Sequence, residues 1–196
     1  MTQMYHARSV EVKFLSTENE YAIHASMKTI SHQNFGILIA YILPGFVTLY
    51  GIGFLSVTVQ GWLAVNPAEA PTIAGFLYVT VASLGIGVVL NTVRRHTLDL
   101  FHQWTGIRQA NWNYKELQEN IAAIEFIIAN QFRFHQFHGN LFLALPVPFT
   151  AYAWSQSFES WWWCGLFLIM EGIVFLGSRD CYRNYCRRLE EILGTR

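Results

Sequence analysis

Two long runs of the sequence contain no charged residue, and they restrict the possible folds more than any other feature. Residues 36–59 read GILIAYILPGFVTLYGIGFLSVTV, and residues 72–93 read TIAGFLYVTVASLGIGVVLNTV. Each run exceeds the roughly 20 residues that a helix needs to cross a bilayer core. Only 13% of the 196 residues are charged, against about 25% in soluble domains. We therefore expect membrane-spanning helices; a large soluble bundle of buried helices is the alternative.

Two shorter apolar runs follow and complete a predicted domain of four transmembrane helices. The expected spans cover about residues 36–59, 72–93, 137–155 and 159–178. No Lys or Arg lies in the loops 60–71 and 155–160, whereas the other three polar segments contain all thirteen. Cytoplasmic loops gather Lys and Arg, so both termini and the middle loop are predicted to face the cytoplasm. The sequence thus predicts an all-α, multi-pass protein of the cell inner membrane.

The predicted transmembrane domain, residues 36–177, includes a helical cytoplasmic loop, residues 94–138. Its first part, VRRHTLDLFHQWTG, continues the second span to Gly106, a suitable C-cap residue. Another helix is expected to begin near Asn113, with Glu116 at capping-box spacing. An apolar stripe then predicts one long helix into the third span; its members are Leu117, Ile121, Ile124 and Ile128.

Two further segments flank the predicted transmembrane domain. Residues 1–35 are polar, without the apolar core of a signal peptide, and are expected to be cytoplasmic. Residues 178–196 are expected to continue the fourth span as a cytoplasmic helix. Such extensions commonly pack on each other or on a partner.

Prolines and small residues mark where the predicted spans bend or approach one another. Pro44 in the first span, and Pro146 and Pro148 in the third, should kink or loosen their helices. Ser83 and Gly87 form a small-xxx-small pair that permits close helix packing. A second such face contains Gly165 and Gly172. Packing within the chain and packing between subunits are both possible uses of these faces.

The first candidate site combines histidines and an aspartate at the cytoplasmic membrane boundary. Its members are His96, Asp99, His102, His135 and His138. Imidazole and carboxylate are common metal ligands. On one ideal helix, however, the positions of His96 and His102 differ by a rotation of about 240° around the axis. His96, Asp99 and His102 therefore cannot all converge without distortion. A metal or acid–base site is one hypothesis; structural hydrogen bonding at the interface is the other.

The second candidate site is a basic cluster on the same side of the membrane. Its members are Arg94, Arg95, Arg183, Arg187 and Arg188. Arginines at this boundary anchor the topology and contact anionic headgroups. The alternative is a docking surface for an acidic ligand, a nucleotide or a partner protein.

The third candidate is Glu171, which lies inside the apolar run WWWCGLFLIMEGIVFLG. Ten residues separate it from Trp161, which corresponds to roughly 15 Å along a helix. A carboxylate this deep costs a few kcal/mol when it faces lipid, so Glu171 should face protein or water. We expect either a hydrogen-bonded structural residue or the lining of a pore or pocket. Backbone groups freed at Pro44, Pro146 or Pro148 are candidate partners.

Several stretches carry a resemblance to known proteins. The runs VRRHTLDLFHQWTG, NWNYKEL and FRFHQFHGNLFLALP resemble a group of small bacterial membrane proteins with an LPGF span. In architecture the chain is also similar to four-helix membrane subunits of prokaryotic antiphage systems, such as the Kiwa membrane subunit. That resemblance implies an oligomeric membrane component that works beside a cytoplasmic partner.

The sequence thus favours a non-enzymatic, oligomeric inner-membrane protein, a pore-forming or membrane-perturbing effector or sensor. A cytoplasmic protein partner and a role in antiphage defence are expected, and no cofactor is. A membrane-embedded metal-dependent enzyme that uses the His/Asp set is one alternative, and a small ion-coupled transporter with Glu171 is another. The formal net charge is zero, so direct nucleic-acid binding is not expected.

Overall fold

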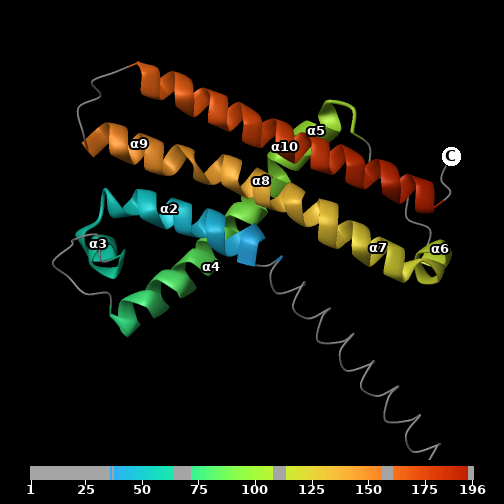
Figure 1. Cartoon of the computed structure of the whole chain (residues 1–196), viewed down its shortest axis with the longest axis horizontal. Coiled ribbons are helices and arrows are strands. Elements are labelled where there is room, and N and C mark those ends of the chain that lie inside the picture. The colour runs from blue at the N-terminus through green and yellow to red at the C-terminus, as the bar shows by residue number, and fades with distance from the viewer. Residues whose placement is uncertain (1–35, 37, 64–71, 108–113, 156–160, 194–196) are drawn as a thin grey trace, which may run out of the picture. The chain divides into compact units, whose positions relative to one another are not determined.

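The computed structural model describes the protein at residues 36, 38–63, 72–107, 114–155 and 161–193. Within these ranges the chain forms helices and no β-strand (Figure 1), so the all-α prediction is confirmed. The chain divides into two compact units, residues 1–36 and 37–196, and the helices named below belong to the second. The predicted cytoplasmic segment 1–35 lies outside the described residues.

The helices follow one another with few intervening residues. In chain order they are the π-helix η1 (Leu38–Ile42), α2 (Leu43–Gly53), α3 (Val57–Leu63), α4 (Ile73–His96), α5 (Leu98–Trp104), α6 (Tyr114–Glu119), α7 (Ile121–Ile127), the π-helix η2 (Ile128–Phe132), α8 (Arg133–Ala144), α9 (Pro146–Ser155) and α10 (Trp162–Ile192).

The helices have two distinct ends (Figure 1). The end of α2, the start of α4, the end of α9 and the start of α10 lie on the same side, which we call the tryptophan end. Helices α5, α6, α7 and the last part of α10 lie toward the opposite side, the polar end. The tryptophan end takes its name from highly exposed indoles: Trp154, Trp161, Trp162 and Trp163. The apolar segments therefore alternate in direction.

One described helix is long and apolar enough to cross a bilayer. It runs over Ile73–Trp104, comprises α4 and α5, and has a mean hydropathy of 2.2 over its most apolar window. Thr72 begins it by accepting a hydrogen bond from the Gly75 N–H at 3.0 Å. The apolar helix Leu38–Gly53 is shorter.

The first predicted span, residues 36–59, does not form one continuous helix. Helix α2 ends at Gly53, where the Phe54 N–H bonds the Gly51 carbonyl in a tighter turn. Glycine is a poor helix former, so Gly51 and Gly53 weaken the helix where it stops. The chain then turns into the separate helix α3.

Two of the prolines lie where the helix geometry changes: Pro44 follows the π-helix η1, and Pro146 begins α9, whereas Pro148 lies within α9. Pro44 has a compensating contact. Because proline has no N–H, Pro44 leaves the carbonyl of Ala40 without its helical partner. The amide Nδ2 of Asn140, on α8, donates to that carbonyl at 2.7 Å. In the third predicted span, α8 ends at Ala144 and α9 begins at Pro146. The side chain of Asn140 on α8 thus supplies the hydrogen bond that Pro44 cannot donate.

Helices α2 and α4 pack closely through small residues. A Cβ at Gly45 would collide with the backbone of Ser83, and a Cβ at Gly87 would collide with the backbone of Tyr41. The Ser83–Gly87 pair therefore serves packing inside the chain. On α10, by contrast, a Cβ at Gly165 or Gly172 would meet no atom within 4 Å.

A cluster of buried apolar residues joins α7 to the last turns of α10. Its members are Ile107, Ile124, Ile127, Tyr182, Tyr185, Cys186, Leu189 and Leu193. The predicted stripe is wrong at Ile121, which is 49% exposed, whereas Ile127 is buried in its place. The chain turns at Asn120 and widens to a π-helix at Ile128–Phe132, so a straight helical repeat does not hold across this region.

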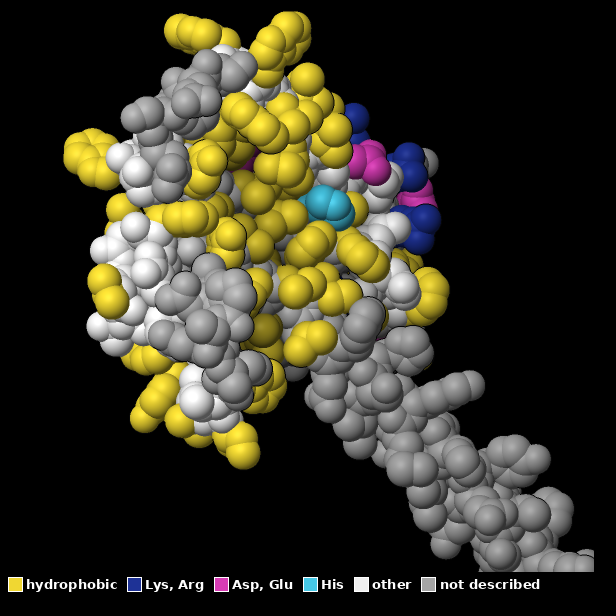
Figure 2. Space-filling view, turned by 60° about the vertical axis from the view of Figure 1, so that its left-hand side comes forward, with side chains coloured by type: hydrophobic (Ala, Val, Ile, Leu, Met, Phe, Trp, Pro, Cys, Tyr) yellow, Lys and Arg dark blue, Asp and Glu magenta, His cyan; other side chains and the backbone are white. Residues whose placement is uncertain are grey.

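Large apolar side chains are exposed along much of this bundle. On α4 and α10 they include Phe76, Leu77, Val81, Val89, Leu166, Leu168, Ile169, Ile173 and Leu176. Figure 2 views the tryptophan end, where apolar atoms dominate the face and the coloured charged side chains gather at one edge. In water, exposed apolar patches of this extent mark an interaction with protein or membrane.

Candidate functional site

A group of buried polar side chains lies where four helices meet near the polar end. This polar cluster consists of Arg94 from α4, Asp99 and His102 from α5, His135 from α8 and Ser178 from α10. Three of the five, Asp99, His102 and His135, belong to the predicted His/Asp set. The structure thus brings together side chains that are up to 84 positions apart in the chain.

Arg94 is the centre of the polar cluster, and its side chain is only 2% exposed. Its Nη1 donates to Asp99 Oδ1 at 2.7 Å, and its Nη2 donates to Asn91 Oδ1 at 3.1 Å. The methylenes of Arg94 lie across α8 at Gly139, where a Cβ would come within 2.5 Å of Cδ. A glycine there gives the arginine room to reach its partners.

His135 connects Arg94 to α10. Its Nε2 lies 2.7 Å from Arg94 Nη1, and its Nδ1 lies 3.0 Å from the Ser178 carbonyl oxygen. The same Nε2 lies 3.0 Å from Asp99 Oδ1. The ring also stacks on Tyr182, with centroids 4.6 Å apart. These contacts fix the orientation of the imidazole.

Burial and charge set the ionisation of Arg94, Asp99 and His102, which lie beyond the predicted end of the second span at residue 93. Burial raises the pKa of Asp99, but the hydrogen bond with His135 and the charge of Arg94 outweigh it, so this pKa lies below its usual value. Burial lowers the pKa of Arg94, and Asp99 opposes that effect. Burial and then His135 lower the pKa of His102 to about 4. At neutral pH the cluster is therefore a buried Arg–Asp ion pair with a neutral His102.

The other two predicted histidines do not join the cluster. The Nδ1 of His96 lies 2.9 Å from the Thr92 carbonyl, and the Nδ1 of His138 lies 2.7 Å from the Phe134 carbonyl. Each ring therefore bonds its own helix, one turn back. Over the part of the chain that the structure describes, no three His, Cys, Asp or Glu side chains are placed to hold a metal ion.

Ser178, His135 and Asp99 are in sequential contact, as in a nucleophile–base–acid arrangement. Ser178 Oγ lies 3.0 Å from His135 Nδ1, and His135 Nε2 lies 3.0 Å from Asp99 Oδ1. Ser178 and His135 are both fully buried, however, and neither lines the cavity described below. The arrangement holds α5, α8 and α10 together and gives a substrate no access to the serine.

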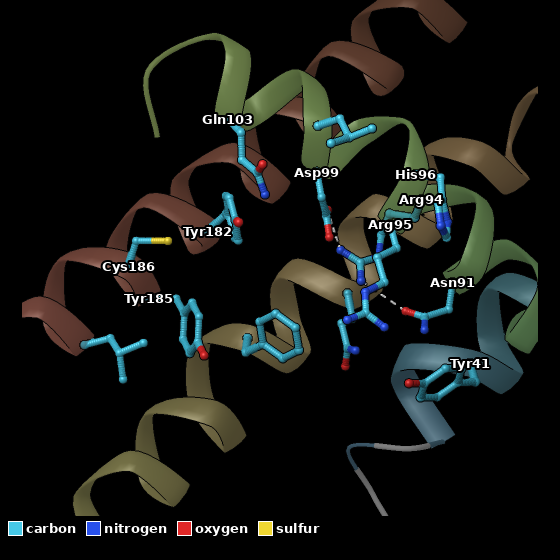
Figure 3. A pocket seen from close by; sticks show the side chains of 14 residues that line it. Tyr41, Asn91, Arg94, Arg95, His96, Asp99, Gln103, Tyr182, Tyr185 and Cys186 are labelled. Carbon is cyan, nitrogen blue, oxygen red and sulfur yellow. Dashed lines mark hydrogen bonds and ion pairs between the residues drawn. The ribbon is translucent and has the colours of Figure 1, made fainter. Parts of the chain in front are cut away.

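Beside the cluster lies a cavity of about 700 Å³, which we call the boundary pocket. Figure 3 shows Arg94, Arg95 and Asn91 on one side and Tyr182, Tyr185 and Cys186 on the other. The remaining lining residues are Tyr41, His96, Asp99, Leu100, Gln103, Phe132, Gln136 and Leu189. Burial raises the pKa of Cys186 to about 11, so its thiol is neutral at pH 7.

The predicted basic cluster divides into two groups. Arg94 and Arg95 line the boundary pocket, whereas Arg183, Arg187 and Arg188 are exposed on α10 and do not line it. The Nη2 of Arg187 bonds Asn184 on the same helix at 3.3 Å. Only two of the five arginines can therefore act together on a ligand in the pocket.

Glu171 is on α10, seven residues before Ser178, and is 8% exposed. Neither carboxylate oxygen has a hydrogen-bond partner among the described residues. The carbonyl freed at Pro44, one of its expected partners, is bonded by Asn140 instead. Glu171 is therefore buried without the structural hydrogen bond that one hypothesis requires.

Sequence reasoning missed three residues that complete these sites: Ser178, Asn140 and Tyr182. Each lies in or next to a run that reads as membrane or cytoplasmic helix, without a motif around it. Asn140, a polar amide in the third predicted span, was the one detectable signal, because buried amides in apolar helices require a partner.

Comparison with known proteins gives no relative: no protein-family model, curated protein or solved structure matches the chain.

Proposed function

We propose that the chain is a non-enzymatic, oligomeric protein of the bacterial inner membrane, a pore-forming or membrane-perturbing effector or sensor that acts with a cytoplasmic partner. One observation carries this proposal. The apolar segments α2, α4, α8–α9 and α10 alternate in direction, with exposed tryptophans at one end and the polar cluster at the other. Set in a bilayer, this arrangement would form four spans, and the Lys and Arg of the loops favour a cytoplasmic position for both termini.

Two features of α10 support an assembly. A Cβ added at Gly165 or Gly172 would meet no described atom within 4 Å, and apolar side chains such as Ile169 and Ile173 are exposed beside these glycines. Small residues let helices of neighbouring subunits approach closely in lipid. At the polar end, Arg183, Arg187 and Arg188 are exposed where a cytoplasmic partner can reach them. The resemblance to antiphage membrane subunits extends this proposal to a role in antiphage defence.

Glu171 is the functional residue of the proposed assembly. A buried carboxylate without a protein partner can exchange protons or attract cations in a water-filled path. A small ion-coupled transporter is the second candidate function, because it would use the same carboxylate. A pore conducts passively along the gradient, whereas a transporter moves its ion only with a coupled substrate.

The test combines membrane potential with molecular mass. Expression of the chain in bacteria should depolarise the cells, as read by a voltage-sensitive dye, and the purified protein should exceed the mass of a monomer. Glu171→Gln should change the depolarisation, whereas Glu191→Gln, an exposed residue of the same helix, should not. A monomeric protein that leaves the membrane potential intact would contradict the proposal.

A further inference from the structure

The boundary pocket has the size and position of a site for a small molecule. Its volume of about 700 Å³ falls in the range of roughly 300–1,000 Å³ that small-molecule sites occupy. It opens among α4, α5, α8, α10 and the π-helices η1 and η2, so six elements contribute side chains. In Figure 3 the side chains of opposite walls face one another across open space.

The charges that line the pocket favour an anion. Asp99 is its one acidic residue, and Asp99 Oδ1 already contacts Arg94 and His135. Arg95 lines the same pocket and forms no salt bridge with any described residue. The fixed charges of the lining therefore leave one arginine uncompensated.

Arg94 supplies a second, independent observation. Its Nε has no hydrogen-bond partner among the described residues, although the side chain is almost fully buried. A buried donor on a charged group is costly to leave without a partner, so the positive charge of Arg94 is incompletely satisfied. Arg94 lines the pocket, and the Arg94–Asp99–His135 contacts hold its guanidinium in place at the wall.

The uncharged polar residues of the lining indicate which class of anion the pocket suits. Asn91, Gln103 and Gln136 bring amides, and Tyr41 brings a hydroxyl, from separate elements around the opening. Several donors arranged around arginine suit the tetrahedral phosphate group, which accepts hydrogen bonds in several directions.

We propose that the boundary pocket binds a small ligand through its phosphate group, with Arg95 as the anion contact and the positive charge of Arg94 beside it. The phosphate belongs either to a soluble nucleotide or to the headgroup of an anionic lipid at the cytoplasmic boundary. This inference goes beyond the proposed function, because binding is measurable whether or not the protein depolarises cells.

The test measures binding to the purified full-length protein in neutral detergent. One arm titrates adenosine monophosphate, and the other titrates short-chain phosphatidylglycerol against phosphatidylcholine of the same chain length. The readout is the thermal unfolding midpoint, which rises saturably when a ligand binds the folded state. Arg95→Gln is the test variant, because Arg95 is exposed and makes no described salt bridge. Arg188→Gln, an exposed arginine outside the pocket, is the matched control.

We expect saturable binding in at least one arm. Arg95→Gln should weaken it by about tenfold or more, the effect of losing one charge-assisted hydrogen bond, while Arg188→Gln leaves it unchanged. A response to the nucleotide alone identifies a soluble source, and a response to phosphatidylglycerol alone identifies a headgroup. No saturable shift in either arm, or equal weakening by Arg95→Gln and Arg188→Gln, would overturn the proposal.

Discussion

The protein contains two buried acidic residues in contrasting surroundings. Asp99 contacts a guanidinium and an imidazole that come from different helices, whereas Glu171 has no hydrogen-bond partner among the described residues. About 10 Å of helix separates Glu171 from Ser178 of the polar cluster. A buried charge with fixed partners holds helices together, while one without partners contributes nothing comparable to the fold. From this difference we infer a structural role for the polar cluster and a functional role for Glu171.

The largest expected effect comes from removing the partner of Arg94. Asp99→Ala leaves a buried guanidinium without its counter-charge, and breaking such a pair costs about 3–5 kcal/mol of unfolding free energy. The measurement is reversible denaturation of the purified protein in mild detergent. Asp180→Ala is the control, because Asp180 is exposed on α10 and should change stability by less than about 1 kcal/mol. If the two substitutions lowered the unfolding free energy equally, the proposed structural role of the polar cluster would be contradicted.

The next effect is a dependence of stability on pH. His102 has a pKa of about 4 in the folded protein, against 6.5 as its ordinary value. Between these values the unfolded chain binds a proton that the folded chain excludes, so stability is full above pH 6.5 and falls as the pH drops toward 4. The loss from this residue is at most about 3 kcal/mol. Unfolding measured across this range should lose this pH dependence in His102→Gln and keep it in His96→Gln.

A smaller loss of stability is expected when Asn140, a hydrogen-bonded amide inside the apolar region, is replaced. Asn140→Ala removes the donor to the Ala40 carbonyl that Pro44 leaves free. An unpaired buried carbonyl costs about 1–3 kcal/mol, so the unfolding free energy should fall by that amount. Asn130→Ala serves as the comparison, because Asn130 is exposed and bonds only its own helix, at Phe126. A stable Asn140→Ala protein would show that the backbone at Pro44 finds another partner.

The smallest effect on stability is expected at Glu171. Glu171→Gln keeps the shape of the side chain and breaks no hydrogen bond within the described chain, so stability should change by less than about 1 kcal/mol. Conductance across planar bilayers, however, should change, because the amide cannot carry a charge. A large loss of stability with unchanged conductance would show that Glu171 has a structural role, as Asp99 has, and would contradict the proposed functional role.

The sequence predicts the helices and some of their interruptions, because these depend on local chemistry. Gly106, with φ of 95°, directly follows Thr105, the C-cap of α5, where a left-handed glycine ends a helix, and α9 begins at Pro146. The failures concern contacts between distant segments. A π-helix at Ile128–Phe132 changes which side chains share a face, and no local pattern signals that change.

The candidate site was only half predictable for the same reason. Helical spacing correctly separates His96 from His102, since their directions differ on one helix. Spacing cannot reveal that Ser178 meets His135, because that contact depends on how α8 and α10 pack. The partner of the Ala40 carbonyl, Asn140, is likewise 100 positions away.

The central claim, four spans with both termini in the cytoplasm, is tested most directly by reporter fusions in bacteria. Alkaline phosphatase is active only outside the inner membrane, and green fluorescent protein fluoresces only inside. We expect active phosphatase for fusions after residues 66 and 158, and fluorescence for fusions after residues 110 and 196. Fluorescence at all four positions, with the protein extracted from membranes by alkaline carbonate, would contradict the account.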